Sequence, residues 1–481
     1  MKHHFRLKAI ADLVADRNDL NRVLGGNGLI LLGIGAVIGA GIFVLTGQVA
    51  ARHTGPAIIL SFLLAGTACG LAALCYSELA SMIPVAGSAY TYASATLGTF
   101  IAWVIGWDLV LEYSVAASAV STGWSAYFTS FLADWGIVIP SRFTQSMFDT
   151  EGAGINKEAF ADLPAAAIVL LLSALLSLGV RQSAFVNAVI VFIKLAVIIT
   201  FIVAGAFFID PDNWRPLIPE NTGVTGEFGW SGVLRGAGII FFAYIGFDAV
   251  STAAQETRNP QKDMPKGIIG SLAICTVLYI LVSIVLVGVI PYQSLDVAAP
   301  IALAVDYMGL GWFTPFIKIG AIAGLTSVIM VLLLGQSRIF YAIARDGLLP
   351  AWLGHVHPRT RTPHLSTFFV GFIIAIVAAF VPLSILGELV SIGTLFAFVI
   401  VCAGVIVLRY TQPDHPRGFR VPFAPYLPAA GILICLYMMW GLPGDTWVRL
   451  AVWLLIGLVI YFLYGARRAA GRITWTRRET L

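Results

Sequence analysis

Long apolar stretches separated by short charged segments make up most of the chain. The first covers residues 27–51 without an ionisable side chain, and it is long enough for a helix that crosses a bilayer. Later stretches also approach the roughly 20 residues that a transmembrane helix needs. We place those helices at residues 56–83, 97–130, 164–181, 184–208, 233–252, 267–290, 313–341, 366–382, 385–409, 426–441 and 447–465. The pattern predicts an all-α polytopic membrane protein with twelve transmembrane helices.

Glycines interrupt the middle of the first apolar stretch. Gly33, Gly35, Gly39 and Gly41 lie there, and glycine lowers helix stability while allowing close approach to the backbone. We expect the helix to be broken at residues 38–41. Backbone groups freed by a break persist in a membrane where they line a cavity and bind something, and freed N–H groups suit a carboxylate. Tight helix packing through small residues is the alternative, and this stretch alone leaves both open.

A second interrupted stretch covers residues 232–252, where Gly246 is followed closely by Asp248. Two glycine-interrupted spans at matching positions in two five-helix halves are typical of inverted-repeat transporters, whose site lies between the breaks. The pair of breaks therefore favours a binding site over packing alone.

Composition and charge agree with a membrane protein. Hydrophobic residues make up 59% of the chain and charged residues 11%, compared with roughly 25% charged in a soluble domain. With the N-terminus inside, 21 of the 29 Lys and Arg residues fall at inner segments and five at outer ones, which predicts cytoplasmic N- and C-termini. We expect the membrane to be the plasma membrane. Residues 1–22 lack the apolar core of a secretory signal peptide. Five cysteines without a CxxC pair indicate small buried hydrophobes, neither disulfides nor metal ligands.

Five motifs then carry a family resemblance: GIGAVIGAGIFVLTG, YSELASMIPVAGSAYTYASATLG, IGWDLVLEY, FFAYIGFDAVSTAAQETRNPQ and RIFYAIARDGLLP. In this order they resemble the cationic amino acid transporter branch of the amino acid–polyamine–organocation (APC) superfamily, over nearly the whole chain. The resemblance implies a LeuT-like five-plus-five inverted repeat, two extra C-terminal helices and alternating access for L-amino acids. We accordingly divide the chain into a cytoplasmic segment 1–26, a first repeat 27–208, an extracellular connection 209–232, a second repeat 233–409, two further helices 410–465 and a cytoplasmic tail 466–481.

The same resemblance assigns the substrate-binding residues. Four consecutive amides would bind the substrate α-carboxylate, those of Gly39, Ala40, Gly41 and Ile42, in agreement with the expected direction of the helix dipole. Carbonyl groups at the open ends of both broken helices would accept hydrogen bonds from the α-amino group. They belong to Val37, Ile38, Phe241, Phe242 and Ala243, and the pocket also includes Ile245. Phe242 would be the gate and Met330 would line the far end, although both could be ordinary core side chains.

Lys194 lies about ten residues into its span, near the middle of the membrane. An intramembrane lysine is costly and indicates a function, with a structural amine bonded to carbonyl groups as the alternative. Within the superfamily it resembles a lysine that occupies the place of a sodium ion in sodium-coupled relatives, so we expect it to carry the coupling proton. Thr326 and Ser327 are its expected hydroxyl partners.

Two acids lie four residues apart, Asp108 and Glu112, and therefore on one face of their helix. Glu112 resembles a family acid beside the substrate pocket, where it could bind a cationic side chain directly or through water. A structural carboxylate bonded to hydroxyl groups is equally compatible with the sequence. Asp108 would support it, and Asp248 is expected to brace the restarted half-helix.

These observations predict a secondary transporter for L-amino acids that are cationic (such as arginine or lysine), small and neutral (such as alanine), or of both kinds, with proton symport. An exchanger and a sodium-coupled carrier are alternatives, and an intramembrane enzyme or a channel are alternatives from other classes. The chain has neither a P-loop nor an HExxH motif, and His355, His357 and His364 lack metal-site spacing. We expect no metal, no cofactor besides the proton, no sodium, no nucleic acid partner and a lipid bilayer as environment. An accessory subunit is left open.

Overall fold

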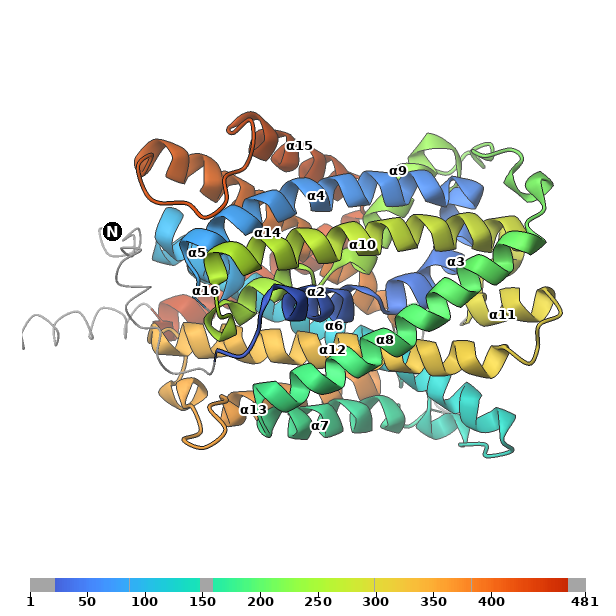
Figure 1. The fold of residues 1–481 in the computed structure, drawn as a ribbon, viewed down its shortest axis with the longest axis horizontal. Helices are drawn as coiled ribbons and strands as arrows, with labels where there is room; N and C mark the ends of the chain where they lie inside the picture. Colours follow the sequence, from blue (N-terminus) through green and yellow to red (C-terminus); the bar gives the residue numbers. More distant parts are fainter. Residues whose placement is uncertain (1–21, 86, 148–158, 298, 382, 466–481) are drawn as a thin grey trace, which may run out of the picture.

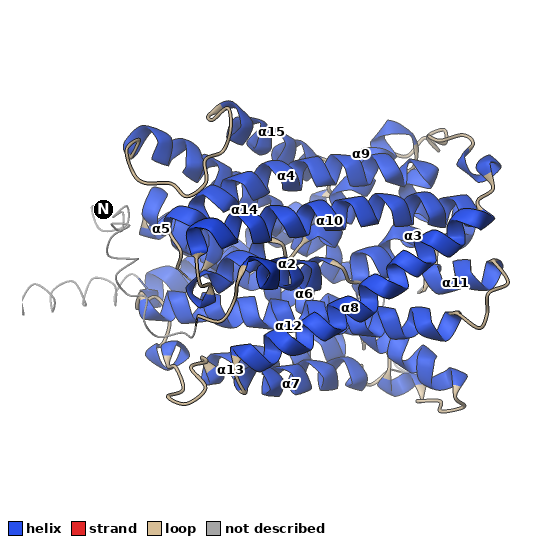
Figure 2. Ribbon diagram, viewed as in Figure 1, coloured by secondary structure: helices blue, strands red, loops and turns tan. Residues whose placement is uncertain are grey.

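The structure, a computed structural model, describes residues 22–85, 87–147, 159–297, 299–381 and 383–465. Every regular element within these ranges is a helix, and most helices lie side by side along one axis (Figures 1 and 2). Eight are long and apolar enough to cross a membrane, and four shorter apolar helices accompany them. This is the architecture of a polytopic membrane protein, while the number of spans and the division into repeats stay predictions. The tail 466–481 and most of segment 1–26 lie outside the described residues.

The helices follow the predicted apolar stretches. They are α2 (Gly26–Val37), α3 (Thr46–Val49), α4 (Ile58–Met82), α5 (Ser88–Thr96), α6 (Thr99–Asp134), α7 (Leu163–Ser177), α8 (Val180–Gly205), α9 (Gly229–Ile240), α10 (Pro260–Val289), α11 (Pro300–Tyr307), α12 (Thr314–Arg345), α13 (His364–Phe380), α14 (Leu383–Thr411), α15 (Tyr426–Trp440) and α16 (Gly444–Ile460). Two of them, α5 and α11, were not predicted because they are much shorter than the roughly 20 residues of a transmembrane helix.

Helices α10 and α12 hold central positions in the bundle. The first packs against α2 and α4, and the second packs against α6, α8 and α2. Most of the largest fully buried side chains are aromatic, yet Lys194 and Arg338 are among them. Because a buried charge in a membrane protein needs partners and usually has a function, these two cations direct attention to their surroundings.

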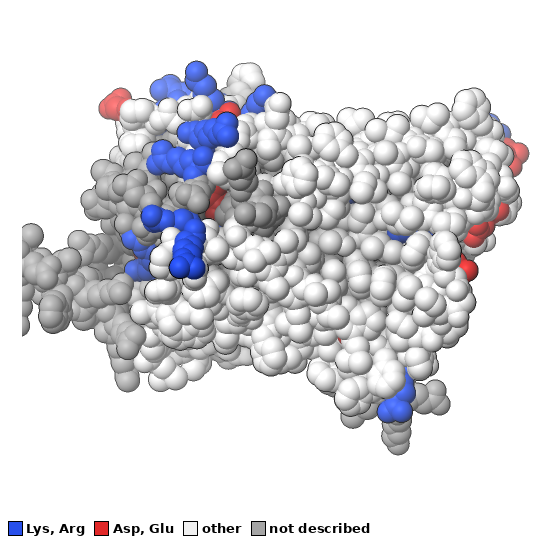
Figure 3. All heavy atoms as spheres, turned by 60° about the horizontal axis from the view of Figure 1, so that its bottom comes forward, with Lys and Arg blue, Asp and Glu red and all other residues white. Residues whose placement is uncertain are grey.

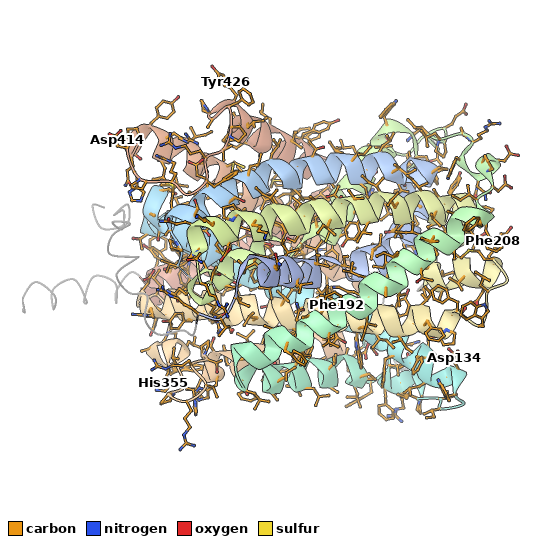
Figure 4. The ribbon with its side chains drawn as sticks, viewed as in Figure 1. Asp134, Phe192, Phe208, His355, Asp414 and Tyr426 are labelled. Atoms are coloured by element: carbon orange, nitrogen blue, oxygen red, sulfur yellow. The ribbon has the colours of Figure 1, made fainter. Side chains whose placement is uncertain are left out.

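Charged side chains gather at the ends of the bundle, with Lys and Arg concentrated at one of them (Figure 3). We call this the basic end. It holds the starts of α2 and α10, which are joined where Lys266 Nζ donates to Asn27 Oδ1 at 3.0 Å. Figure 4 places Asp134 at the opposite end from His355 and Asp414, and there Lys318 of α12 forms a 2.6 Å ion pair with Asp134.

Candidate functional site

The first apolar span is broken. Helix α2 ends at Val37, Ile38 has an extended conformation (φ −76°, ψ 101°), and a π-helical turn, Gly41–Leu45, then continues into α3. Residues 38–39 lie within the predicted interval, and we call residues 37–41 the first break. The amides of the first turn after a break have no acceptor within their own helix. Within the described chain, no main-chain bond outside the helices is donated by the amides of Gly39, Ala40 or Gly41.

The second interrupted span is also broken. Helix α9 passes into a 3-10 turn, Phe241–Tyr244, and the chain restarts as a 3-10 helix, Asp248–Glu256. We call residues 241–247 the second break. Gly246 has φ +109°, a conformation that side chains disfavour, so glycine is required at this turn.

The two breaks pack against each other through their glycines. A Cβ atom added to Gly41 would lie 2.3 Å from Ala243 Cα, and one added to Gly246 would lie 2.8 Å from Ala36 Cβ. Each glycine therefore allows close contact with the other broken helix. Packing and an open backbone, the two explanations left open by the sequence, are both present here.

Tyr279 of α10 bridges the two breaks and was not identified from the sequence. Its hydroxyl lies 2.6 Å from the carbonyl oxygen of Val37 and 2.8 Å from that of Ala243. A phenol has one hydrogen, so it donates to one of these carbonyls at a time. The only signal in the sequence was a single tyrosine in a span whose other polar side chains are small hydroxyls, those of Ser271, Thr276 and Ser283.

Lys194 of α8 lies beside the first break. Its Nζ atom donates to the carbonyl oxygens of Ile34 at 2.9 Å, Gly35 at 3.0 Å and Ile38 at 2.9 Å, and it contacts Ser327 Oγ at 2.8 Å. These carbonyls end α2, where the helix dipole favours a cation. Two residues earlier on α8, Phe192 is 65% exposed on the outer face (Figure 4), whereas Lys194 is fully buried.

One of the expected contacts around Lys194 is wrong, and one carbonyl assigned to the substrate is shared with it. Ser327 is a partner, but Thr326 is not, because its hydroxyl donates to Ile322 and accepts from Trp124 Nε1 at 2.9 Å. Adjacent residues of a helix point in different directions, so the two hydroxyls could not both face α8. The carbonyl of Ile38, assigned to the substrate amine, already accepts from Lys194.

The three predicted acids have different surroundings. Asp248 accepts hydrogen bonds from the Tyr113 hydroxyl and from the Gly246 amide at 3.3 Å, so it is bonded to the turn that precedes the restarted helix. Asp108 and Glu112 are both fully buried, and neither forms an ion pair with a described residue. Asp108 has no hydrogen-bond partner in the described part of the chain. Buried carboxyl groups without hydrogen-bond partners are uncommon in folded proteins, so both acids are candidates for contact with a ligand.

Phe242 and Ile245 are buried at the second break, with exposed fractions of 5% and 4%. Met330 is elsewhere: it lines a small separate cavity, together with Leu24, Leu32, Leu176, Ala184, Asn187, Val331 and Leu334. This position argues against the expected place of Met330 in the pocket. Val328 faces the first break instead, because a Cβ atom on Gly39 would lie 2.5 Å from its Cγ2.

Comparison with known proteins identifies relatives along the whole chain. The family model described as amino acid permease matches residues 24–464. The chain is 48% identical to the branched-chain amino acid permease BcaP of Bacillus subtilis, over 97% of this chain and 98% of the relative. It is 47% identical to the methylthioribose transporter of the same organism, over 98% and 99%. It is 33% identical to the vacuolar cationic amino acid transporter 4 of Arabidopsis thaliana, over 96% of this chain and 95% of the relative.

Proposed function

Because the chain belongs to the amino acid permease family of the APC superfamily, and is thus a transporter, we propose that it moves L-α-amino acids across the cell membrane together with protons. The main support is the contact between the two breaks, where free amides lie beside carbonyl groups in a fully buried region. An α-amino acid has a carboxylate and an ammonium group that match these two sets of atoms. The basic end would face the cytoplasm.

The carboxylate would bind the amides of Gly39, Ala40 and Gly41. The amide of Ile42 is a weaker candidate because it already donates to the Gly39 carbonyl at 3.2 Å. The substrate ammonium would bind carbonyls of both breaks, including that of Ala243. The Ala243 carbonyl would then accept from both the ammonium and the Tyr279 hydroxyl, or from the ammonium in place of the hydroxyl. A carbonyl oxygen can accept two hydrogen bonds, so such sharing is chemically allowed.

Lys194 would carry the coupling proton. When protonated, its ammonium group holds the end of α2 through three carbonyls and also binds Ser327 of α12. Loss of the proton removes one donor and the charge, which weakens the link between α2, α8 and α12 and favours another arrangement of the helices. The same four oxygen atoms could hold a sodium ion only if Lys194 moved away, which supports proton coupling over sodium coupling.

The substrate side chain is proposed to be cationic or small and neutral. Buried Glu112 and Asp108 without ion-pair partners support a cationic side chain. A branched-chain substrate is the second candidate, because the relative named BcaP is 48% identical over almost the full length. Exchange in place of net symport is compatible with the same site.

The decisive experiment is uptake by the purified protein in liposomes, with the pH gradient and the sodium gradient imposed separately. We expect uptake of L-amino acids to follow an inward proton gradient and to ignore sodium. Competition by arginine, alanine and leucine then ranks the substrate classes. Equal competition by an amino acid and its carboxyl-amidated analogue would contradict the proposed carboxylate site, and sodium-stimulated uptake would contradict the coupling.

A further inference from the structure

A fully buried ion pair lies toward the basic end of the bundle. Arg338 of α12 donates to Glu256 Oε1 from Nε at 2.9 Å and from Nη2 at 2.5 Å, and each side chain is 1% exposed. The other carboxylate oxygen, Oε2, has no partner among the described residues. A pair whose main role is stability would be expected to satisfy both oxygens, because an incompletely bonded buried pair contributes little net stability.

Glu256 also joins the two broken helices. Its carbonyl oxygen accepts from the amides of Val23 at 2.9 Å and Leu24 at 3.0 Å, just before α2 begins. In return, the amide of Arg258 donates to the Leu24 carbonyl at 2.8 Å. These three bonds tie the start of the first broken helix to the end of the second. A movement of either half-helix at this end therefore carries the other with it.

The ion pair is the charged contact between this joined unit and α12. It connects Glu256, in the joined unit, to Arg338, three turns further along α12 than Ser327, which binds Lys194. A small cavity of about 10 Å³ is lined by residues of α2, α8 and α12, among them Leu32, Asn187 and Leu334, so the packing beside the joined unit is incomplete there. Opening would thus start where the pair holds the helices together.

We propose that Glu256 and Arg338 form the latch on the cytoplasmic side of the transport cycle. The pair holds the joined ends of both broken helices against α12 while the substrate site is closed, and it separates before the substrate leaves toward the cytoplasm. Both are positioning residues, since they act through the half-helices and do not touch the site. This inference rests on the proposed function, including the orientation given there.

A thiol placed under α2 tests the latch. Ser271 of α10 is fully buried, and a Cβ atom on Gly33 of α2 would lie 2.3 Å from its Oγ. Ser271→Cys therefore becomes reachable from the cytoplasmic side only when α2 moves away. The five native cysteines are buried, so the parent protein gives the background for labelling by a membrane-impermeant maleimide in inside-out vesicles.

We expect the neutralised pair Glu256→Gln with Arg338→Met to raise the labelling rate of Ser271→Cys about tenfold, because the closed state loses its latch without acquiring a lone buried charge. The matched control is the ion pair at the other end of α12, changed as Asp134→Asn with Lys318→Met. It should leave cytoplasmic labelling unchanged. The exchanged pair Glu256→Arg with Arg338→Glu should restore slow labelling.

An unchanged labelling rate in a neutralised variant that remains folded would overturn the latch, as would an equal increase in the control variant. If the neutralised variant does not fold, Glu256→Asp keeps the charge but shortens the side chain, and it must still accelerate labelling for the proposal to stand. Amino acid uptake by the unmodified protein is measured in parallel. Absent uptake would refute the proposed function, whereas the labelling rates report on the latch independently of any substrate.

Discussion

The Nζ atom of Lys194 lies 2.9 Å from the carbonyl oxygen of Ile38, so the buried ammonium directly contacts the first break. The residue expected to carry the proton and the backbone expected to bind substrate are therefore adjacent. A change in the charge of Lys194 alters the carbonyl end of α2 without any intermediate residue, which gives a short physical route for coupling.

Lys194→Met should reduce proton-driven uptake to the level of empty vesicles. Methionine keeps much of the side-chain bulk but leaves the carbonyls of Ile34, Gly35 and Ile38 without their shared donor. Lys318→Met removes a lysine from the other end of the bundle and should retain most of the uptake. Proton-driven uptake that survives Lys194→Met would exclude this lysine as the coupling group.

Tyr279→Phe should tighten substrate binding while slowing transport. Without the hydroxyl, a buried carbonyl of Val37 or Ala243 is unsatisfied in the empty protein, which costs about 1–3 kcal/mol. The substrate ammonium then supplies the missing donor, so the bound state loses less than the empty one. Isothermal titration would measure a lower Kd and thermal melting a less stable empty protein.

Tyr244→Phe is the control for this change. Tyr244 belongs to the second break, but its hydroxyl donates to the carbonyl of Phe62 in α4 at 3.2 Å and to no carbonyl of either break. It should lower thermal stability without changing the Kd. A weaker binding of substrate by Tyr279→Phe would show that its hydroxyl supports the bound state.

Substitutions of Gly39 and Gly41 should differ in whether a second substitution can restore substrate binding. The three atoms nearest to a Cβ at Gly39 all belong to the side chain of Val328, so adding Val328→Ala to Gly39→Ala should recover most of the binding. Gly41→Val drives its side chain into the main chain at Ala243 and should abolish binding, because the two breaks can no longer approach. Binding of a radiolabelled amino acid by purified, monodisperse protein is the measurement. Recovery by Val328→Ala in the Gly41 variant would contradict the geometry.

Glu112→Gln should weaken the binding of arginine more than the binding of alanine if the substrates are cationic amino acids. Removing one partner of a buried charge pair costs about 2–5 kcal/mol, whereas alanine makes no such pair. Competition assays on the two amino acids give the difference, and Asp108→Asn on the same face of α6 is the companion variant. Equal losses for arginine and alanine would assign Glu112 to structure.

The buried carboxyl group of Asp162, outside the membrane spans, should make the thermal stability depend on pH. It lies just before α7, accepts from Ser125 Oγ at 2.6 Å and from the Ala165 amide at 3.1 Å, and burial raises its pKa to about 6. Because the pKa of Asp162 is higher in the folded state than in the unfolded state, its contribution to the free energy of unfolding is fully present below the pKa of the unfolded state. That contribution is lost as the pH rises to about 6. Asp162→Asn can still cap the helix but does not titrate. It should therefore make the melting temperature less dependent on pH between about pH 4 and pH 6. An unchanged pH profile would contradict this account.

The sequence by itself determined the class of the protein and the positions where its helices break. Apolar stretches of membrane-spanning length are a local property, and so are the glycines of the first break and Gly246. Lys194 was identified for the same reason, since a charge in an apolar span is visible without a neighbour. The family resemblance then supplied roles that spacing alone could not give, and the relatives confirm the family.

Only the tertiary structure decided which side chains meet. Tyr279 lies between the two breaks because α10 packs against α2 and α4, a relation between segments far apart in the chain. The choice of Ser327 over Thr326, and of Val328 over Met330, depends on the rotation of α12 about its axis. The pairing of Glu256 with Arg338 was missed because each lies near a charged loop in sequence. Their mutual burial arises only when the two helix ends are brought together.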